Sequence, residues 1–127
     1  MPEAVIAVAE EAPFRFDLDT FTATVRQRWP NARFVPATGR VASVTRGQWQ
    51  IPDADSWPDQ VLVEFDIEGQ GLMLDSPEDD LRAAVIAAAT SVPDFPGDGS
   101  VILAEWANEF IPLRPNMTAE EILAARD

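Results

Sequence analysis

Residues 61–68, with the sequence VLVEFDIE, constrain the fold more than any other stretch of this 127-residue chain. Every second residue is apolar, namely Val61, Val63, Phe65 and Ile67. A period of two is typical of a half-buried β-strand, so this stretch should place one face on the core and Glu64, Asp66 and Glu68 on the other. The letters EGQG then predict a turn, and LMLD predicts the returning strand of a hairpin.

Two helices are predicted on either side of this hairpin. The first is capped by Asp17 or Asp19 and has apolar residues at helical spacing. It should end before Pro30, because the residue before a proline is pushed out of the helical region. The second helix is predicted over 77–92, with Ser76 as its N-cap and a proline at its first position.

The remaining segments carry weaker patterns. The stretch 41–51 reads as a strand, with Gly47 as a bulge or strand end. The stretch 101–113 fits a helix or a strand, and its β-branched residues and flanking glycines and prolines favour the strand. Thr118 and Glu121 form a capping box that predicts a short helix over 119–126.

These elements predict an α+β fold, with an antiparallel β-sheet of about four to five strands. Two main helices should pack on one face of the sheet, with a short C-terminal helix in addition. Residues 1–13 are expected as an N-terminal arm or an edge strand, and residues 14–127 as a single α+β domain.

The composition excludes much of the usual enzyme chemistry. The chain has no His, Cys, Tyr or Lys, so all nine of its basic residues are Arg. It therefore lacks the commonest general base, the thiol nucleophile, the Schiff-base amine and the commonest metal ligand. An enzyme built on this chain would have to use carboxylates, hydroxyls and Arg, as paired-carboxylate glycosidases do. We expect no catalytic residue and no cofactor.

The net charge of −13 is unevenly distributed along the chain. Residues 26–46 contain five Arg and no acid, whereas residues 51–127 contain seventeen acids and three Arg. This total disfavours nucleic acid as a partner and favours a basic protein partner, which it would attract over a distance. Solubility alone is the competing explanation. No stretch is apolar enough to span a membrane, and no secretory signal is visible, so we expect a cytoplasmic protein.

The acidic row Glu64, Asp66 and Glu68 has two main interpretations. The acids form a solvated strand face, paired across the sheet with Arg40 and Arg46, or they form a surface that binds a partner. Internal pairing is also the favoured interpretation of the arginine group between Arg26 and Arg46, with anion binding or half of a self-complementary interface as the alternatives.

The loop that follows the 41–51 strand is a second candidate for partner binding. It places two tryptophans beside acids, and these five residues are Trp49, Asp53, Asp55, Trp57 and Asp59. Tryptophan is frequent in binding hot spots, but each tryptophan could instead fold back onto the core. The acid spacing is similar to a calcium loop without its glycine, so we predict no metal site here.

Two classes of function follow. The first is a small acidic, non-catalytic protein that binds a basic protein, as immunity proteins, antitoxins and secretion chaperones do. In size, isoelectric point and element order the chain resembles the small acidic chaperones of type III secretion, with no shared motif. The alternative is a carboxylate-dependent enzyme, or a ligand- or divalent-cation-binding domain, that uses Glu64, Asp66 or Glu105. Homo-oligomerisation stays open in both classes.

Overall fold

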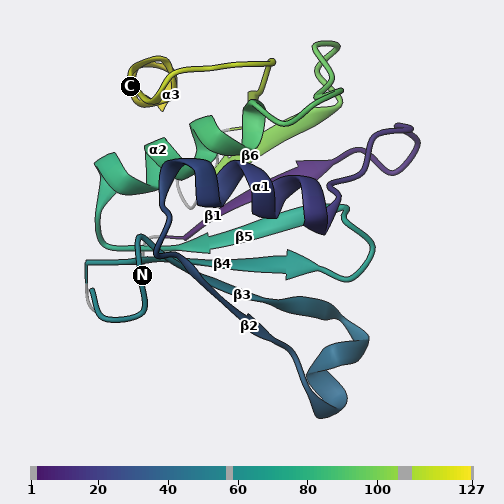
Figure 1. Ribbon diagram of the computed structural model, residues 1–127. Helices are drawn as coiled ribbons and strands as arrows, with labels where there is room; N and C mark the ends of the chain where they lie inside the picture. The colour runs from purple at the N-terminus through teal and green to yellow at the C-terminus, as the bar shows by residue number, and fades with distance from the viewer. Residues whose placement is uncertain (1–2, 57–58, 106–109, 127) are drawn as a thin grey trace.

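The computed structural model describes residues 3–56, 59–105 and 110–126, and Figure 1 shows the arrangement of its elements. In chain order these are β1 (Glu3–Val8), α1 (Leu18–Arg28), β2 (Arg33–Pro36), the 3₁₀ helix η1 (Gly39–Ser43), β3 (Thr45–Ile51), β4 (Val61–Asp66), β5 (Gly71–Asp75), α2 (Asp79–Thr90), β6 (Val101–Glu105), β7 (Phe110–Pro112) and α3 (Ala119–Arg126). Among the described residues, no helix is both long and apolar enough to cross a membrane.

The strands form one antiparallel sheet in the order β2-β3-β4-β5-β1-β6-β7. The predicted α+β class with an antiparallel sheet is confirmed, but the expected count of four to five strands is wrong, because the described residues form a sheet of seven. The 61–66 and 71–75 strands pair as the predicted hairpin. The additional strands are β2, in a segment for which no strand was predicted, and the second of the two strands that the 101–113 stretch forms.

The N-terminal strand β1 lies inside the sheet and is not the arm or edge strand expected from residues 1–13. It pairs with β5 on one side and with β6 on the other. Its residues alternate in burial, with Ala4, Ile6 and Val8 in the core. Because both sides of its backbone are hydrogen-bonded, β1 connects the hairpin to the C-terminal strands.

The core lies between one face of the sheet and the helices. Phe21 and Val25 of α1 are buried in the same cluster as alternate residues of the strands, including Phe65 and Leu74. Most of α2 is buried as well, and its many alanines allow the helix to approach its neighbours closely. Figure 1 shows α1 and α2 over the same side of the sheet.

The stretch 41–51 differs from the predicted single strand. Its first residues form η1, and β3 begins only at Thr45. The predicted bulge at Gly47 is confirmed, because the register between β3 and β4 shifts between Thr45 and Gly47. Gly47 has φ +150°, and a Cβ there would overlap Phe34 and the backbone of Val35. The glycine therefore allows β2 to approach the bulge.

Helix α2 begins two residues later than predicted, with Glu78 and not Ser76 in the N-cap position. The Ser76 hydroxyl accepts a hydrogen bond from the backbone N–H of Glu78, so it closes a short turn ahead of the helix. The buried guanidinium of Arg82 donates to the Ser76 carbonyl and to the Asp79 carboxylate, which holds this turn against the first turn of the helix.

The C-terminal part follows its predictions. The 101–113 stretch contains β6 and β7, as the strand interpretation requires, and residues 106–109 lie outside the described residues. The capping box is confirmed: the Thr118 N–H donates to the Glu121 carboxylate, and the Glu121 N–H donates to the Thr118 hydroxyl.

Helix α1 supports a prediction about pH. The Asp17 carboxylate caps this helix and accepts hydrogen bonds from the Thr20 backbone N–H and hydroxyl. These bonds, together with the charge of Arg46, lower the pKa of Asp17 from its ordinary 3.8. A lowered pKa stabilises the fold fully above pH 3.8, and this contribution is lost as the pH falls through the lowered value.

We therefore expect Asp17→Asn, which keeps a capping side chain, to be less stable than the wild type at pH 7, with a difference that shrinks as the pH falls below 3.8. Urea denaturation at a series of pH values measures this difference. A difference that stays constant down to pH 2 would contradict the role of the carboxylate charge.

Candidate functional site

The sheet face that points away from α1 and α2 is partly exposed, and we call it the open face. One row of cross-strand neighbours runs over it through all seven strands, in the order Val35, Gln48, Glu64, Met73, Val5, Ala104 and Phe110. Several of these side chains are apolar and exposed, with Met73 at 44% and Phe110 at 69%. The open face is therefore a mixed surface, with apolar side chains around a carboxylate.

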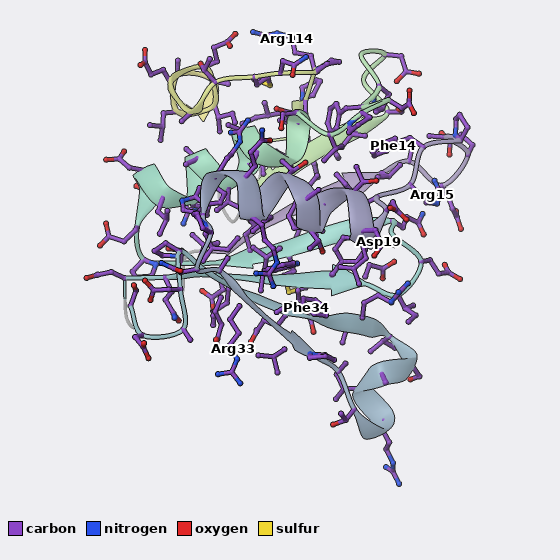
Figure 2. The ribbon with its side chains drawn as sticks, in the orientation of Figure 1. Phe14, Arg15, Asp19, Arg33, Phe34 and Arg114 are labelled. Atoms are coloured by element: carbon purple, nitrogen blue, oxygen red, sulfur yellow. The ribbon has the colours of Figure 1, made fainter. Side chains whose placement is uncertain are left out.

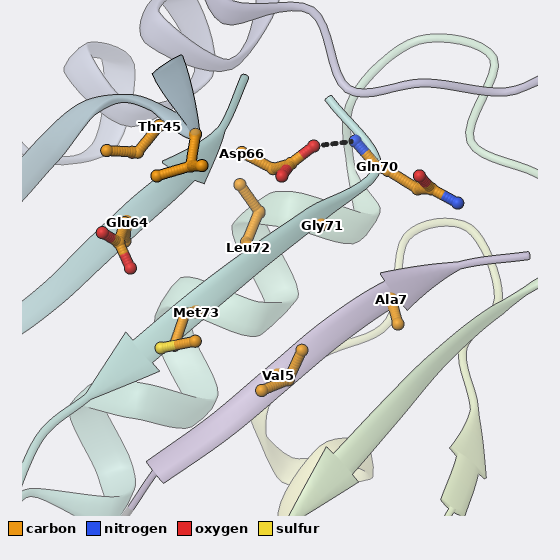
Figure 3. A pocket seen from close by; sticks show the side chains of 10 residues that line it. Val5, Ala7, Thr45, Glu64, Asp66, Gln70, Gly71, Leu72 and Met73 are labelled. Atoms are coloured by element: carbon orange, nitrogen blue, oxygen red, sulfur yellow. Dashed lines mark hydrogen bonds between the residues drawn. The ribbon is translucent and has the colours of Figure 1, made fainter. Parts of the chain in front are cut away.

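A hollow of about 420 Å³ lies in the middle of the open face. Figure 3 shows it over β4, β5 and β1. Its apolar lining includes Val5, Ala7, Val44 and Met73, and its polar lining includes Glu64 and Asp66. Its lining is mainly apolar, as is usual for binding pockets, which carry few polar groups that fix orientation.

Two of the three acids predicted to share one face of the 61–68 strand do lie on that strand. Glu64 and Asp66 lie on β4 at the hollow, whereas Glu68 lies in the turn after the strand and is exposed. The prediction that Glu68 belongs to the strand face is wrong, because β4 ends at Asp66. The Asp66 carboxylate accepts hydrogen bonds from the backbone N–H groups of Glu68 and Gln70, so it holds this turn. Glu64 is therefore the less engaged carboxylate of the two.

The predicted pairing of this acidic face with Arg40 and Arg46 is absent from the described residues. Gly47 lies opposite Phe65, so a regular ladder would place Arg46 opposite Asp66. The bulge places Thr45 there instead and leaves Arg46 as the additional residue. In the described part of the chain, ion pairs join Arg82 to Asp79 and Arg114 to Glu121. Within that part, neither Arg40 nor Arg46 forms an ion pair, and both are exposed.

The prediction that Trp49 binds a partner is wrong, because its side chain is 0% exposed. It packs against Phe21 and Phe34, and the guanidinium carbon of Arg26 lies 5.5 Å from the centre of its ring. The alternative interpretation, in which it folds onto the core, is the one observed. Trp57 lies outside the described residues.

The three aspartates of the loop between β3 and β4 do not converge on one point. Asp53 is half-buried, and its carboxylate accepts hydrogen bonds from the Asp55 backbone N–H and the Ser56 hydroxyl. These bonds lower the pKa of Asp53, with Ser56 the larger cause. Asp55 and Asp59 are exposed. Within residues 3–56, 59–105 and 110–126, no group of three acidic side chains is placed to hold a metal ion.

A second hollow, of about 300 Å³, lies between the loop before α1 and the loop after α2. Figure 2 labels Phe14 and Arg15, which line it. The Arg15 guanidinium donates to the backbone carbonyls of Glu10, Ala12 and Phe14. Because the cation already holds its own loop together, this hollow is a weaker candidate than the one on the open face.

The apolar side of the main hollow was not predicted from the sequence. Val5 and Ala7 alternate with buried residues in β1, and Met73 does so in β5, so a period of two is present in both segments. That signal places them on the opposite face from the core. It does not show that β1 lies next to β5, which brings these residues together.

Comparisons with protein-family models, with curated proteins and with solved structures found no match to this chain.

Proposed function

We propose that this chain is a small acidic, non-catalytic protein that binds a basic protein partner on the open face of its sheet. The observation that supports this proposal most directly is the hollow, where an apolar floor lies beside Glu64 and Asp66. Binding a protein partner without catalysis is also how an immunity protein, an antitoxin or a secretion chaperone acts.

The charge of the chain supports the same class of partner. A net charge of −13 attracts a basic protein over distances comparable to the Debye length, about 10 Å at 0.1 M salt. The exposed apolar side chains of the open face then supply contact area that is removed from water on binding. Long-range attraction therefore brings the partner to the chain, and close packing then holds it on the open face.

The test is a pull-down from lysate of the native host at low salt, followed by elution with a salt step. Ala7→Leu fills the hollow, and Ala84→Leu adds the same side chain to α2, away from the open face. Both positions are half-buried, so we expect both variants to fold.

We expect the wild type and Ala84→Leu to retain the same basic protein, and Ala7→Leu to lose at least about 90% of it, because its Kd should rise at least about tenfold, or by about 1.4 kcal/mol. Equal retention by Ala7→Leu would contradict the proposed face. If the wild type retains no protein that salt releases, the proposal itself is wrong.

A further inference from the structure

The hollow owes its depth to two small residues on neighbouring strands. Gly71 of β5 lies opposite Ala7 of β1, so the sheet has almost no side chain at that point. Met73 and Val5 form a taller pair in the next row of the open face, and Val44 forms another wall. The Ile67 N–H donates to the Val44 carbonyl at 3.1 Å, which fixes Val44 beside the end of β4.

The two carboxylates at this hollow, Glu64 and Asp66, form no ion pair with any arginine among the described residues. The neighbours of Glu64 across the sheet are Gln48 and Met73, and neither carries a positive charge. Among the described residues, the Asp66 carboxylate accepts hydrogen bonds from backbone N–H groups, and Arg46, displaced by the bulge, forms no ion pair with it. A half-buried carboxylate beside an apolar floor favours an incoming cation, because water solvates it only in part.

The shape and charge together select among cations. A ligand that fits must lay an aliphatic chain on Val5 and Met73 and bring a positive group to Glu64. Lysine and arginine both do so with their stems. Arginine is favoured because its guanidinium is more weakly hydrated than an ammonium and donates two parallel hydrogen bonds to a carboxylate.

We infer that the hollow is a pocket for a single arginine side chain, presented by an extended segment of the protein partner. This inference rests on the proposed function, since it names the group that the open face recognises. The guanidinium would pair with Glu64, with Asp66 close by on the same strand at about 7 Å along the chain. The apolar stem would pack over Ala7 and Gly71 between the taller side chains.

The test uses blocked tripeptides, acetyl-Val-Arg-Val-amide and its lysine and citrulline analogues, at 50 mM salt. Citrulline has nearly the shape of arginine without its charge. Binding is followed by NMR through the methyl signals of Val5, Val44 and Met73, which line the hollow. We expect the arginine peptide to bind at least about tenfold more tightly than the citrulline peptide and more tightly than the lysine peptide.

Matched variants locate the site. Glu64→Gln should weaken the arginine peptide about tenfold, whereas Glu120→Gln, the same charge change at an exposed position in α3, should leave its affinity unchanged. Ala7→Leu should abolish binding, and Ala84→Leu in α2 should not. Equal affinity for arginine and citrulline, or for arginine and lysine, would overturn the inference, as would signals that move only outside the hollow.

The two proposals can fail separately. Suppose that Ala7→Leu loses the protein partner, but the arginine and citrulline peptides bind equally. The arginine pocket would then be wrong, and the proposed function would stand. In the opposite case, the arginine peptide binds tightly in the hollow, but no protein is captured through the open face. This result would support the pocket and overturn the proposed function.

Discussion

Replacing Gly69 by alanine is expected to destabilise the protein by about 3 kcal/mol or more. Gly69 has φ +71°, and a Cβ built there would overlap the backbone carbonyl oxygen of Phe16. The left-handed conformation alone costs a non-glycine residue roughly 1–2 kcal/mol. The overlap adds to this cost, because relieving it disturbs the 2.8 Å hydrogen bond from the Phe16 N–H to the Gly69 carbonyl.

Gly39 provides a matched control for this substitution. Its φ of +65° is nearly the same, but a Cβ there would meet no atom within 4 Å. Gly39→Ala should therefore cost only the conformational part, about 1–2 kcal/mol. Urea denaturation of both variants separates the two contributions, and equal losses would contradict the importance of the contact with Phe16.

The effect of Gly69→Ala should extend to the open face. Asp66 and Gly69 belong to the same turn, in which the Gly69 N–H donates to the Asp66 carbonyl and the Asp66 carboxylate holds two further N–H groups. Displacing this turn displaces Asp66 at the hollow. The sequence predicts a turn at EGQG, but the contact with Phe16 depends on tertiary packing and could not be predicted.

The elements with a strong local signal are those that the sequence predicts well. The 61–75 hairpin, the helix capped by Asp17 and the capping box at Thr118 each combine periodicity with a terminal residue of known geometry. The signal around Ser76 is equally local, yet the residue closes a turn instead of capping the helix. Both uses satisfy the same hydroxyl, so a single sequence does not distinguish them.

The arrangement of the strands is less predictable, and the candidate site depends on it. The alternation in β1 predicts two faces but not its neighbours β5 and β6, which complete the hollow and the row across the sheet. The pairing of charges across the sheet also depends on the register, because a shift of one residue changes which side chains face each other. The bulge at Gly47 moves Arg46 out of line with Asp66, so the acidic face retains the unmatched charge on which the proposed function rests.

The burial of Trp49 could have been predicted from the sequence, because Trp49 alternates with Gln48 and Gln50 and is followed by Ile51 at the same spacing of two. Polar neighbours on both sides of an aromatic residue in a strand favour its burial. The two glutamines mark the opposite face, and Gln48 belongs to the row of the open face. The hot-spot interpretation gave more weight to the neighbouring acids of the loop than to this alternation.

Replacing Trp49 by alanine is expected to cost about 3–5 kcal/mol, the range typical of large aromatic residues in a packed core. The ring lies 5.2 Å from that of Phe34 and 6.5 Å from that of Phe21, measured between ring centres, so its removal takes one member from an aromatic group that joins β2, β3 and α1. The cation–π contact with Arg26 is lost as well. Thermal and urea unfolding measure the loss.

Trp49→Phe separates packing from recognition. It keeps a ring in the core and removes Nε1, which is buried without a hydrogen-bond partner among the described residues, so the expected loss is smaller, about 1–2 kcal/mol. This variant should bind the protein partner as the wild type does, because the ring faces the core and not the open face. A loss of partner binding by folded Trp49→Phe would contradict this assignment. The neighbouring Gln48→Ala should change stability by no more than about 0.5 kcal/mol, because the Gln48 side chain is exposed on the open face.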